Sequence, residues 1–170
     1  MQQSICPSTG RITDGRHTLP VRVYYEDTDF GGIVYHANYL KFAERGRTEF
    51  LRCLGIDQTA MKADTGVVFA ARSLSIDFDA PAVMDDCLTV STWVESISGA
   101  RLVLAQQIDR NDDHGPELPS DGHASDKNIS TRLATLTVTL ACIDDRGRPV
   151  RLPTDIRDSF MSQHLAVTGA

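Results

Sequence analysis

"YYEDTDFGGIVYHANYLKFAERGRTEFLR", residues 24–52, passes from a strand pattern into a long amphipathic helix and so decides the fold. Residues 19–25 alternate apolar and polar side chains, which predicts a strand. From about residue 35 to 54, apolar side chains recur at spacings of three and four, which predicts a helix with a wide apolar face. Gly46 lies in that face and costs the helix about 1 kcal/mol relative to alanine. We therefore expect close packing at Gly46 and a helix wrapped by other structure.

The rest of the chain is dominated by segments in which apolar and polar residues alternate, as in half-buried strands. The residues SISGA, 96–100, favour a hairpin turn, so the middle strands are predicted to be antiparallel. A sheet with one apolar face can bury the long helix by curling around it, and this predicts an α+β domain. Strands are expected at 67–82, 87–96, 101–108 and 130–143, and short helices at 57–64 and 154–163.

The domain organisation follows from length and local composition. A chain of 170 residues has the size of one domain. Residues 1–18 are polar and rich in turn formers, so we expect a flexible leader followed by a single domain over 19–165. Residues 111–128 contain almost no large apolar side chain and are expected to form a long polar loop insertion.

Composition narrows the classes of function. The net charge of −6 argues against general electrostatic affinity for nucleic acid. No run approaches the roughly 18 apolar residues of a transmembrane segment, and the start has no signal-peptide core, so a cytoplasmic location is expected. The sequence has no dinucleotide or P-loop motif.

No metal or cofactor is predicted. The four cysteines form no CxxC pattern, which argues against a zinc or redox motif. His114 and His123 lie among acidic residues of the polar loop, and a solvated loop is favoured there over a weak metal site. We expect Cys53, Cys87 and Cys142 to pack as small apolar side chains. Cys6 belongs to the leader.

The join between the first strand and the long helix has the elements needed to attack a carbonyl group. The helix is expected to begin just after Gly31 and Gly32, and its first N–H groups have no intrahelical partners. With the helix dipole, these groups stabilise an anion such as the oxyanion of a reacting carbonyl. Asp29 lies just upstream and supplies a nucleophile or general base, which is the minimum for acyl transfer or hydrolysis.

A structural interpretation of the same residues competes with the catalytic one. Acidic residues before a helix commonly cap it, and this applies to each of Glu26, Asp27 and Asp29. A lone histidine such as His36 is more often packed or solvated than catalytic. The spacing alone leaves both interpretations open.

The motif resembles that of a known family. Residues 24–51 are similar to the signature of the 4-hydroxybenzoyl-CoA thioesterase branch of hotdog-fold proteins. The greater similarity is to the acyl-CoA thioesterases associated with the bacterial Tol–Pal system, which share the run D-T-D-x-x-G-x-V-Y-H-x-x-Y. The resemblance covers residues 19 to about 160. It implies a hotdog fold, in which a curved antiparallel sheet wraps a long central helix.

The resemblance also implies an activity, the hydrolysis of an acyl-CoA thioester to the free acid and CoA. Asp29 matches the catalytic carboxylate of the family, and His36 matches the histidine whose backbone N–H polarises the thioester carbonyl. Glu26 and Asp27 match motif positions and are given support roles. Substrate-binding roles are implied for Gly31 and Gly32, which match the turn before the helix. Tyr25 and Tyr35 are given the same role, with core packing as the alternative.

The resemblance further implies a homodimer or homotetramer with the site between subunits. The partners are then an acyl-CoA substrate and, as a second candidate carrier, acyl carrier protein. The phosphates of CoA need cations, and four arginines near predicted strand ends are candidates, although each is more often a solvated surface charge: Arg101, Arg146, Arg148 and Arg151.

Two other functions are consistent with the sequence. The first is a non-catalytic module that binds acyl-CoA or acyl carrier protein, with the motif kept for structure. The second is a hotdog hydratase or dehydratase, against which the run DTDFGGIVYH argues. Glu44 is a further candidate carboxylate, but its spacing to Arg47 favours an ion pair on the helix surface.

Overall fold

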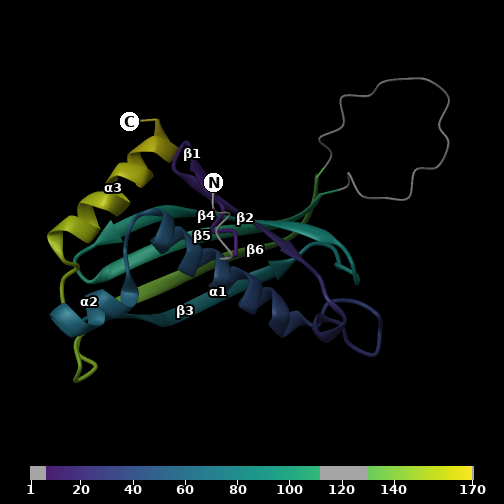
Figure 1. Cartoon of the computed structure of the whole chain (residues 1–170), viewed down its shortest axis with the longest axis horizontal. Helices are drawn as coiled ribbons and strands as arrows, with labels where there is room; N and C mark the ends of the chain where they lie inside the picture. Colours follow the sequence, from purple (N-terminus) through teal and green to yellow (C-terminus); the bar gives the residue numbers. More distant parts are fainter. Residues whose placement is uncertain (1–6, 112–129, 170) are drawn as a thin grey trace, which may run out of the picture.

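The computed structural model describes residues 7–111 and 130–169, in which a curved antiparallel sheet lies against one long helix (Figure 1). The strand order is β1-β2-β4-β5-β6-β3, and the paired neighbours are antiparallel. The predicted α+β architecture is therefore confirmed. The elements are β1 (Arg11–Thr13), β2 (Arg16–Arg22), the 3-10 helix η1 (Tyr25–Asp27), α1 (His36–Cys53), α2 (Gln58–Thr65), β3 (Val68–Phe78), β4 (Cys87–Ser98), β5 (Arg101–Asn111), β6 (Ser130–Ile143) and α3 (Thr154–Thr168).

The N-terminal segment differs from the prediction. Residues 11–18, expected in the leader, form the β1–β2 hairpin, and β2 pairs with β4. His17 of β2 is fully buried against the ring of Phe50 (centroids 5.8 Å apart) and donates from Nε2 to the Thr9 carbonyl at 2.7 Å. One inward residue of β2 is thus a histidine and the next is Leu19, so the start of this strand does not show an apolar pattern. Residues 1–6 of the predicted leader and 112–128 of the predicted loop, with His114 and His123, lie outside the described residues.

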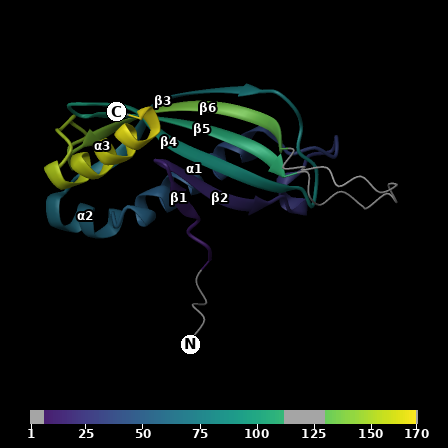
Figure 2. The ribbon, with the colours of Figure 1, turned by 90° about the horizontal axis from the view of Figure 1, so that it is seen from above.

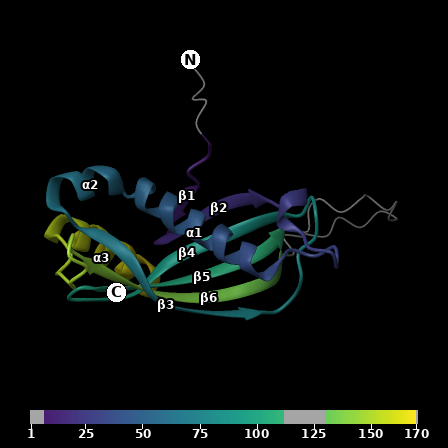
Figure 3. The same cartoon turned by 90° about the horizontal axis from the view of Figure 1, so that it is seen from below.

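The helix α1 lies along one face of the sheet (Figure 3), and this inner face is apolar because alternate residues of the central strands are buried. One buried cluster surrounds Phe42, and a second surrounds Phe50 together with Phe160 of α3. Each large side chain buried in this way contributes about 1.5–3 kcal/mol. The alternation predicted for these segments is confirmed, because the buried residues of β4, β5 and β6 include Leu88, Val90, Val94, Leu102, Leu104, Ile108, Leu136, Val138, Leu140 and Cys142.

The long helix comes close to the sheet at Gly46, as its sequence position predicts. A Cβ atom built at Gly46 would lie 2.7 Å from Val90 Cγ1. Beside it, the buried Gln106 donates from Nε2 to the Ala43 carbonyl (2.8 Å) and to Thr92 Oγ1 (2.9 Å). The absence of a side chain at Gly46 therefore lets a buried amide join the helix backbone to β4 and β5.

The predicted ion pair between Glu44 and Arg47 does not form. Arg47 instead donates from Nη1 to Gln106 Oε1 at 2.8 Å, and its burial lowers the pKa of its guanidinium. Glu44 accepts a hydrogen bond from Thr48 Oγ1 at 2.7 Å. Arg47 thus extends the polar contact between helix and sheet.

Strand β3 is one edge of the sheet, next to β6 (Figure 2). Leu74, Ile76 and Phe78 share one face of it, as predicted, but Leu74 and Phe78 are 37% and 51% exposed. The strand ends at Phe78, earlier than the predicted residue 82: the N–H groups of Asp79 and Ala80 both donate to the Leu133 carbonyl, and Pro81 cannot donate a further ladder hydrogen bond. The segment after β3 is thus free to turn toward the start of α1.

Candidate active site

A pocket of about 320 Å³ opens where the start of α1, the preceding loop and the segment after β3 meet. Its polar side chains are Asp29, His36 and Asp79, and the remaining lining is apolar. Both predicted catalytic residues therefore face one cavity, although Asp29 and His36 themselves are exposed. The apolar lining residues are Ile33, Val34, Tyr39, Phe78, Ala80 and Pro81.

The loop before α1 holds Asp29 in a tight turn. The Gly31 N–H donates to Asp29 Oδ1 at 2.7 Å, and the Asp29 N–H donates to the Ile33 carbonyl at 2.9 Å. Gly32 closes the turn onto the Asp29 carbonyl with a φ of +75°, a conformation that favours glycine. Within the described residues, Oδ1 is the oxygen of the Asp29 carboxylate that accepts a hydrogen bond. Oδ2 is therefore left to act as a base or a nucleophile.

The role of the two glycines differs from the prediction. They were expected immediately before the helix, but α1 begins at His36, after a further extended segment in which Val34 pairs with Thr28. Gly31 and Gly32 therefore shape the turn that carries Asp29. Neither lines the pocket, and a substrate-binding role for them stays a prediction.

No side chain of α1 neutralises the positive end of this helix. No side chain caps the helix at Tyr35, and its first turn contains no acidic residue. The first N–H groups of a helix have no intrahelical acceptors and carry the positive end of the helix dipole. His36 is the first helical residue and lines the pocket, so this end of α1 can receive a developing negative charge there.

The other two acids of the motif differ in burial. Asp27 is buried, and its carboxylate accepts a hydrogen bond from the Tyr24 N–H at 2.9 Å. Glu26 is exposed in η1 and does not line the pocket. The contact of Asp27 is consistent with the predicted support role.

Tyr25 and Tyr35 are also exposed, at 80% and 47%, so the alternative of core packing is wrong for both. The Tyr35 ring lies against that of His36, with centroids 4.3 Å apart, and neither tyrosine lines the pocket. Phe30, next to Asp29, is fully exposed as well. A concentration of exposed aromatic side chains therefore surrounds the turn that carries Asp29.

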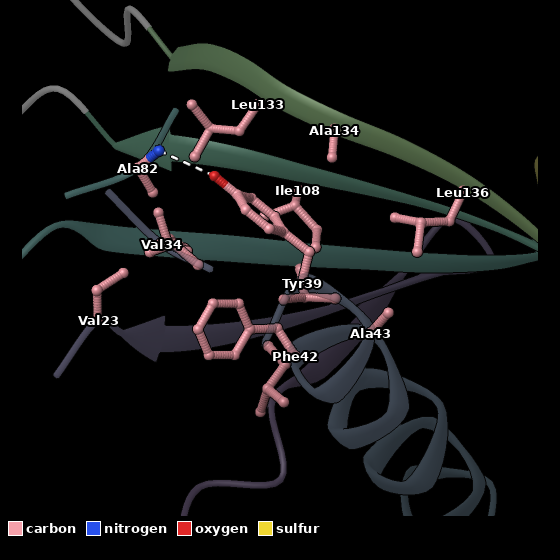
Figure 4. Packing of buried hydrophobic residues seen from close by; sticks show 13 residues of the cluster. Val23, Val34, Tyr39, Phe42, Ala43, Ala82, Ile108, Leu133, Ala134 and Leu136 are labelled. Atoms are coloured by element: carbon pink, nitrogen blue, oxygen red, sulfur yellow. Dashed lines mark hydrogen bonds between the residues drawn. The ribbon is translucent and has the colours of Figure 1, made fainter. Parts of the chain in front are cut away.

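Sequence reasoning missed the inner walls of the pocket. Tyr39 is buried, its hydroxyl oxygen accepts the Ala82 N–H at 2.9 Å (Figure 4), and burial raises the pKa of the phenol. Phe78 meets the Tyr39 ring edge to face, with centroids 5.4 Å apart. Asp79 pairs with Arg132 across 2.9 Å. The proline in DFDAP, residues 77–81, was the available signal that the strand ends there.

The four arginines considered for CoA lie at the opposite end of the sheet. Arg101 starts β5 and pairs with Ala141, whereas the pocket adjoins the end of β3 and the start of β6. Arg148 is engaged by Asp144 at 2.9 Å, and the hydrogen bond from the Arg148 backbone N–H, more than this side-chain contact, lowers the pKa of that carboxyl. These positions do not favour phosphate binding beside this pocket within one copy of the chain.

Residues 7–111 and 130–169 contain no group of three or more His, Cys, Asp or Glu side chains that could hold a metal ion. In the same part of the chain, every helix is too short or too polar to cross a membrane. The described cysteines are free thiols, and burial raises the pKa of Cys142.

Comparison with known proteins links this arrangement to a family. Residues 23–160 match the thioesterase-like superfamily. The acyl-CoA thioesterase YbgC of Haemophilus influenzae is 37% identical over 150 residues, which are 88% of this chain and 97% of that protein. A probable thioesterase from Bartonella henselae is 36% identical, with a TM-score of 0.61 over 81% of this chain and 98% of its own.

The fold is supported by more distant structures. The 4-hydroxybenzoyl-CoA thioesterase of Pseudomonas sp. is 18% identical, with a TM-score of 0.72 over 85% of this chain and 98% of its own. At that identity the likeness shows the fold alone. With the strand order and the enclosed helix, it confirms the predicted hotdog architecture.

Proposed function

The chain belongs to the thioesterase-like superfamily, and from this membership we propose that it hydrolyses acyl-CoA thioesters to the free acid and CoA, with Asp29 as base or nucleophile. The relative from Haemophilus influenzae, which matches most of the chain, is named for that activity. For Asp29 the supporting observation is the pocket that its carboxylate shares with the uncapped start of α1.

The proposed reaction uses the two features of the pocket in turn. The thioester carbonyl oxygen points at the N–H of His36, which stabilises the oxyanion as the carbonyl carbon is attacked. Either Asp29 takes a proton from water, whose oxygen attacks the carbon, or Asp29 attacks directly and water then hydrolyses the anhydride. In both routes the C–S bond breaks, and the sulfur leaves as the CoA thiolate and takes up a proton.

Replacement of the carboxylate by an amide tests the proposal. Asp29→Asn keeps the shape of the side chain and an oxygen that can accept the Gly31 N–H, but it removes the base. We expect kcat on a good acyl-CoA substrate to fall about 10²–10⁴-fold. Glu26→Gln, which neutralises the exposed acid of the same motif, is the matched control and should keep kcat within about threefold. Full activity of Asp29→Asn would refute the assignment.

A smaller effect is expected from the histidine side chain. His36→Ala removes the imidazole but keeps the backbone N–H that is proposed to bind the oxyanion. The loss in kcat should therefore be clearly smaller than that of Asp29→Asn. A loss as large as that of Asp29→Asn, with the fold intact by circular dichroism, would give the imidazole a direct role.

We further propose that the protein works as a homodimer or homotetramer in the cytoplasm, with a second copy covering the site. Support comes from the exposed edge strand β3 and from the exposed Phe30, Tyr25 and Tyr35 around Asp29. Exposed apolar clusters of this kind commonly mark interfaces. Sedimentation equilibrium at micromolar concentration should give at least a dimer, and a monomer would contradict the proposal.

The acyl group of the substrate can be carried by CoA or by acyl carrier protein. CoA is preferred, but a chloroplast acyl-acyl carrier protein thioesterase of Arabidopsis thaliana, 27% identical over 145 residues, makes acyl carrier protein a second candidate. Steady-state rates with the same acyl group on either carrier decide between them. A protein that binds either carrier yet hydrolyses neither across short, long and aromatic acyl groups would instead be a binding module.

A further inference from the structure

A buried amide joins the first turn of α1 to the loop that carries Asp29. Asn38 is 5% exposed, and its Nδ2 donates to the Asp27 carbonyl at 2.8 Å. This bond leaves the helix and reaches the loop, so it is neither a cap nor a bond within α1. Asparagine is a poor helix former, and a buried amide is costly unless it is paired. The residue therefore serves the contact between helix and loop.

The acceptor of this bond is a fixed point of the loop. The Asp27 carbonyl also accepts the Tyr35 N–H at 2.9 Å, so two donors from the α1 side converge on one oxygen. Two residues further on, the Asp29 N–H is bonded to the Ile33 carbonyl. A short run of hydrogen bonds therefore leads from the helix start to the backbone of Asp29.

Building on the proposed function, we propose that Asn38 is a positioning residue: it holds the Asp27 carbonyl against α1 and thereby fixes the Asp29 carboxylate relative to the His36 N–H. Both groups must address one carbonyl carbon and its oxygen, and a misplacement of about 1 Å can cost about 10²-fold in rate. The Tyr35 N–H bond remains without Asn38, so the loop should shift or loosen while the fold is kept.

The first test separates turnover from binding. Asn38→Ala should lower kcat about 10–100-fold and change KM less than about threefold. Asn38→Asp keeps the size of the side chain but turns an oxygen toward the Asp27 carbonyl, so it should be at least as slow. Unchanged kcat in both variants, or an effect confined to KM, would overturn the proposal.

The matched control is the other buried amide that donates to a main-chain carbonyl. Gln106 is 1% exposed and bonds the Ala43 carbonyl at the same 2.8 Å, but it does not line the pocket. Gln106→Ala should lower Tm yet keep kcat within about twofold. If it slowed turnover as much as Asn38→Ala, loss of stability rather than positioning would explain both.

The second test asks whether Asn38 acts through Asp29. In the Asp29→Asn background, Asn38→Ala should slow the residual hydrolysis less than about twofold, because the group that it positions is already gone. The full 10–100-fold loss in that background would overturn the proposal. Full activity of Asp29→Asn alone would instead refute the proposed base.

A third measurement does not depend on activity. Amide hydrogen exchange at Asp29 and Tyr35 should be at least about tenfold faster in Asn38→Ala than in wild type, and unchanged in Gln106→Ala. If the wild-type protein hydrolyses no thioester, the proposed function falls and these exchange rates alone decide whether Asn38 holds the loop. Unchanged exchange in Asn38→Ala would show that it does not.

Discussion

Replacement of Gly46, which lies in the buried face of α1, tests whether close packing against the sheet requires a glycine there. Ala at position 46 would place its Cβ 2.7 Å from Val90 Cγ1, 3.1 Å from Thr92 Oγ1 and 3.3 Å from Gln106 Nε2. Val90 is fully buried and stiff, so it cannot move aside, and Gln106 would be pushed from its carbonyl acceptor. Overpacking of this kind costs about 1–3 kcal/mol.

Helix propensity acts in the opposite direction. Gly→Ala in a helix gains about 1 kcal/mol, so we expect Gly46→Ala to be destabilised by a net amount of up to about 2 kcal/mol. For a chain of 170 residues this corresponds to a fall in Tm of up to about 8 °C. Urea denaturation followed by circular dichroism measures the free energy of unfolding directly.

A second variant identifies the cause. Val90→Ala removes the atom that meets the new methyl group, so the double variant should be at least about 0.5–1 kcal/mol more stable than the sum of the two single changes predicts. If Gly46→Ala proved more stable than wild type and the two changes were additive, the close approach of α1 to β4 would not explain this glycine.

Three further substitutions test other contacts. Burial lowers the pKa of His17, so the unfolded chain binds a proton at this histidine before the folded chain does as the pH falls below about 6.5. The free energy of unfolding should therefore fall more steeply from pH 7.5 to 5.5 in wild type than in His17→Gln. Equal slopes would contradict this. Tyr39→Phe leaves the buried Ala82 N–H without its acceptor and should cost about 1–3 kcal/mol in urea denaturation, whereas a negligible cost would mean that another acceptor replaces the phenol. Arg132→Ala breaks an exposed pair with Asp79 and should change stability by less than about 1 kcal/mol, so a larger change would show that the pair is not screened by solvent.

Most of the secondary structure was predictable because its signals are local. The spacing of Tyr39, Ala43, Gly46, Phe50 and Cys53 is a property of the chain itself, and it predicted α1 to within a residue at each end. The alternation likewise predicted β4, β5 and β6, although β4 and β5 run to Ser98 and Asn111, beyond the predicted residues 96 and 108. β1 and the first part of β2 were missed because an inward residue there, His17, is polar, and its burial depends on Phe50, which lies far along the chain.

The site was predictable only in part. Asp29 and His36 belong to one motif, so a single stretch of sequence predicted both. The opposite wall, Phe78 and Asp79, comes from a segment that only the pairing of β3 with β6 brings alongside. Asn38 was overlooked because its partner, a main-chain carbonyl, leaves no trace in the sequence.

The position of β3 at the sheet edge has a consequence for how the pocket opens and closes. In one copy of the chain, β3 pairs along one side only, with β6, whereas β4 and β5 are paired on both sides. Fraying of an edge strand requires far less free energy than global unfolding. Phe78 ends this strand, so each fraying event would carry away a wall of the pocket while Asp29 and the helix start remain in place. In an isolated copy of the chain, local melting of this strand can thus admit a bulky acyl group without a hinge between domains, whereas a second copy seated on β3 would suppress this route.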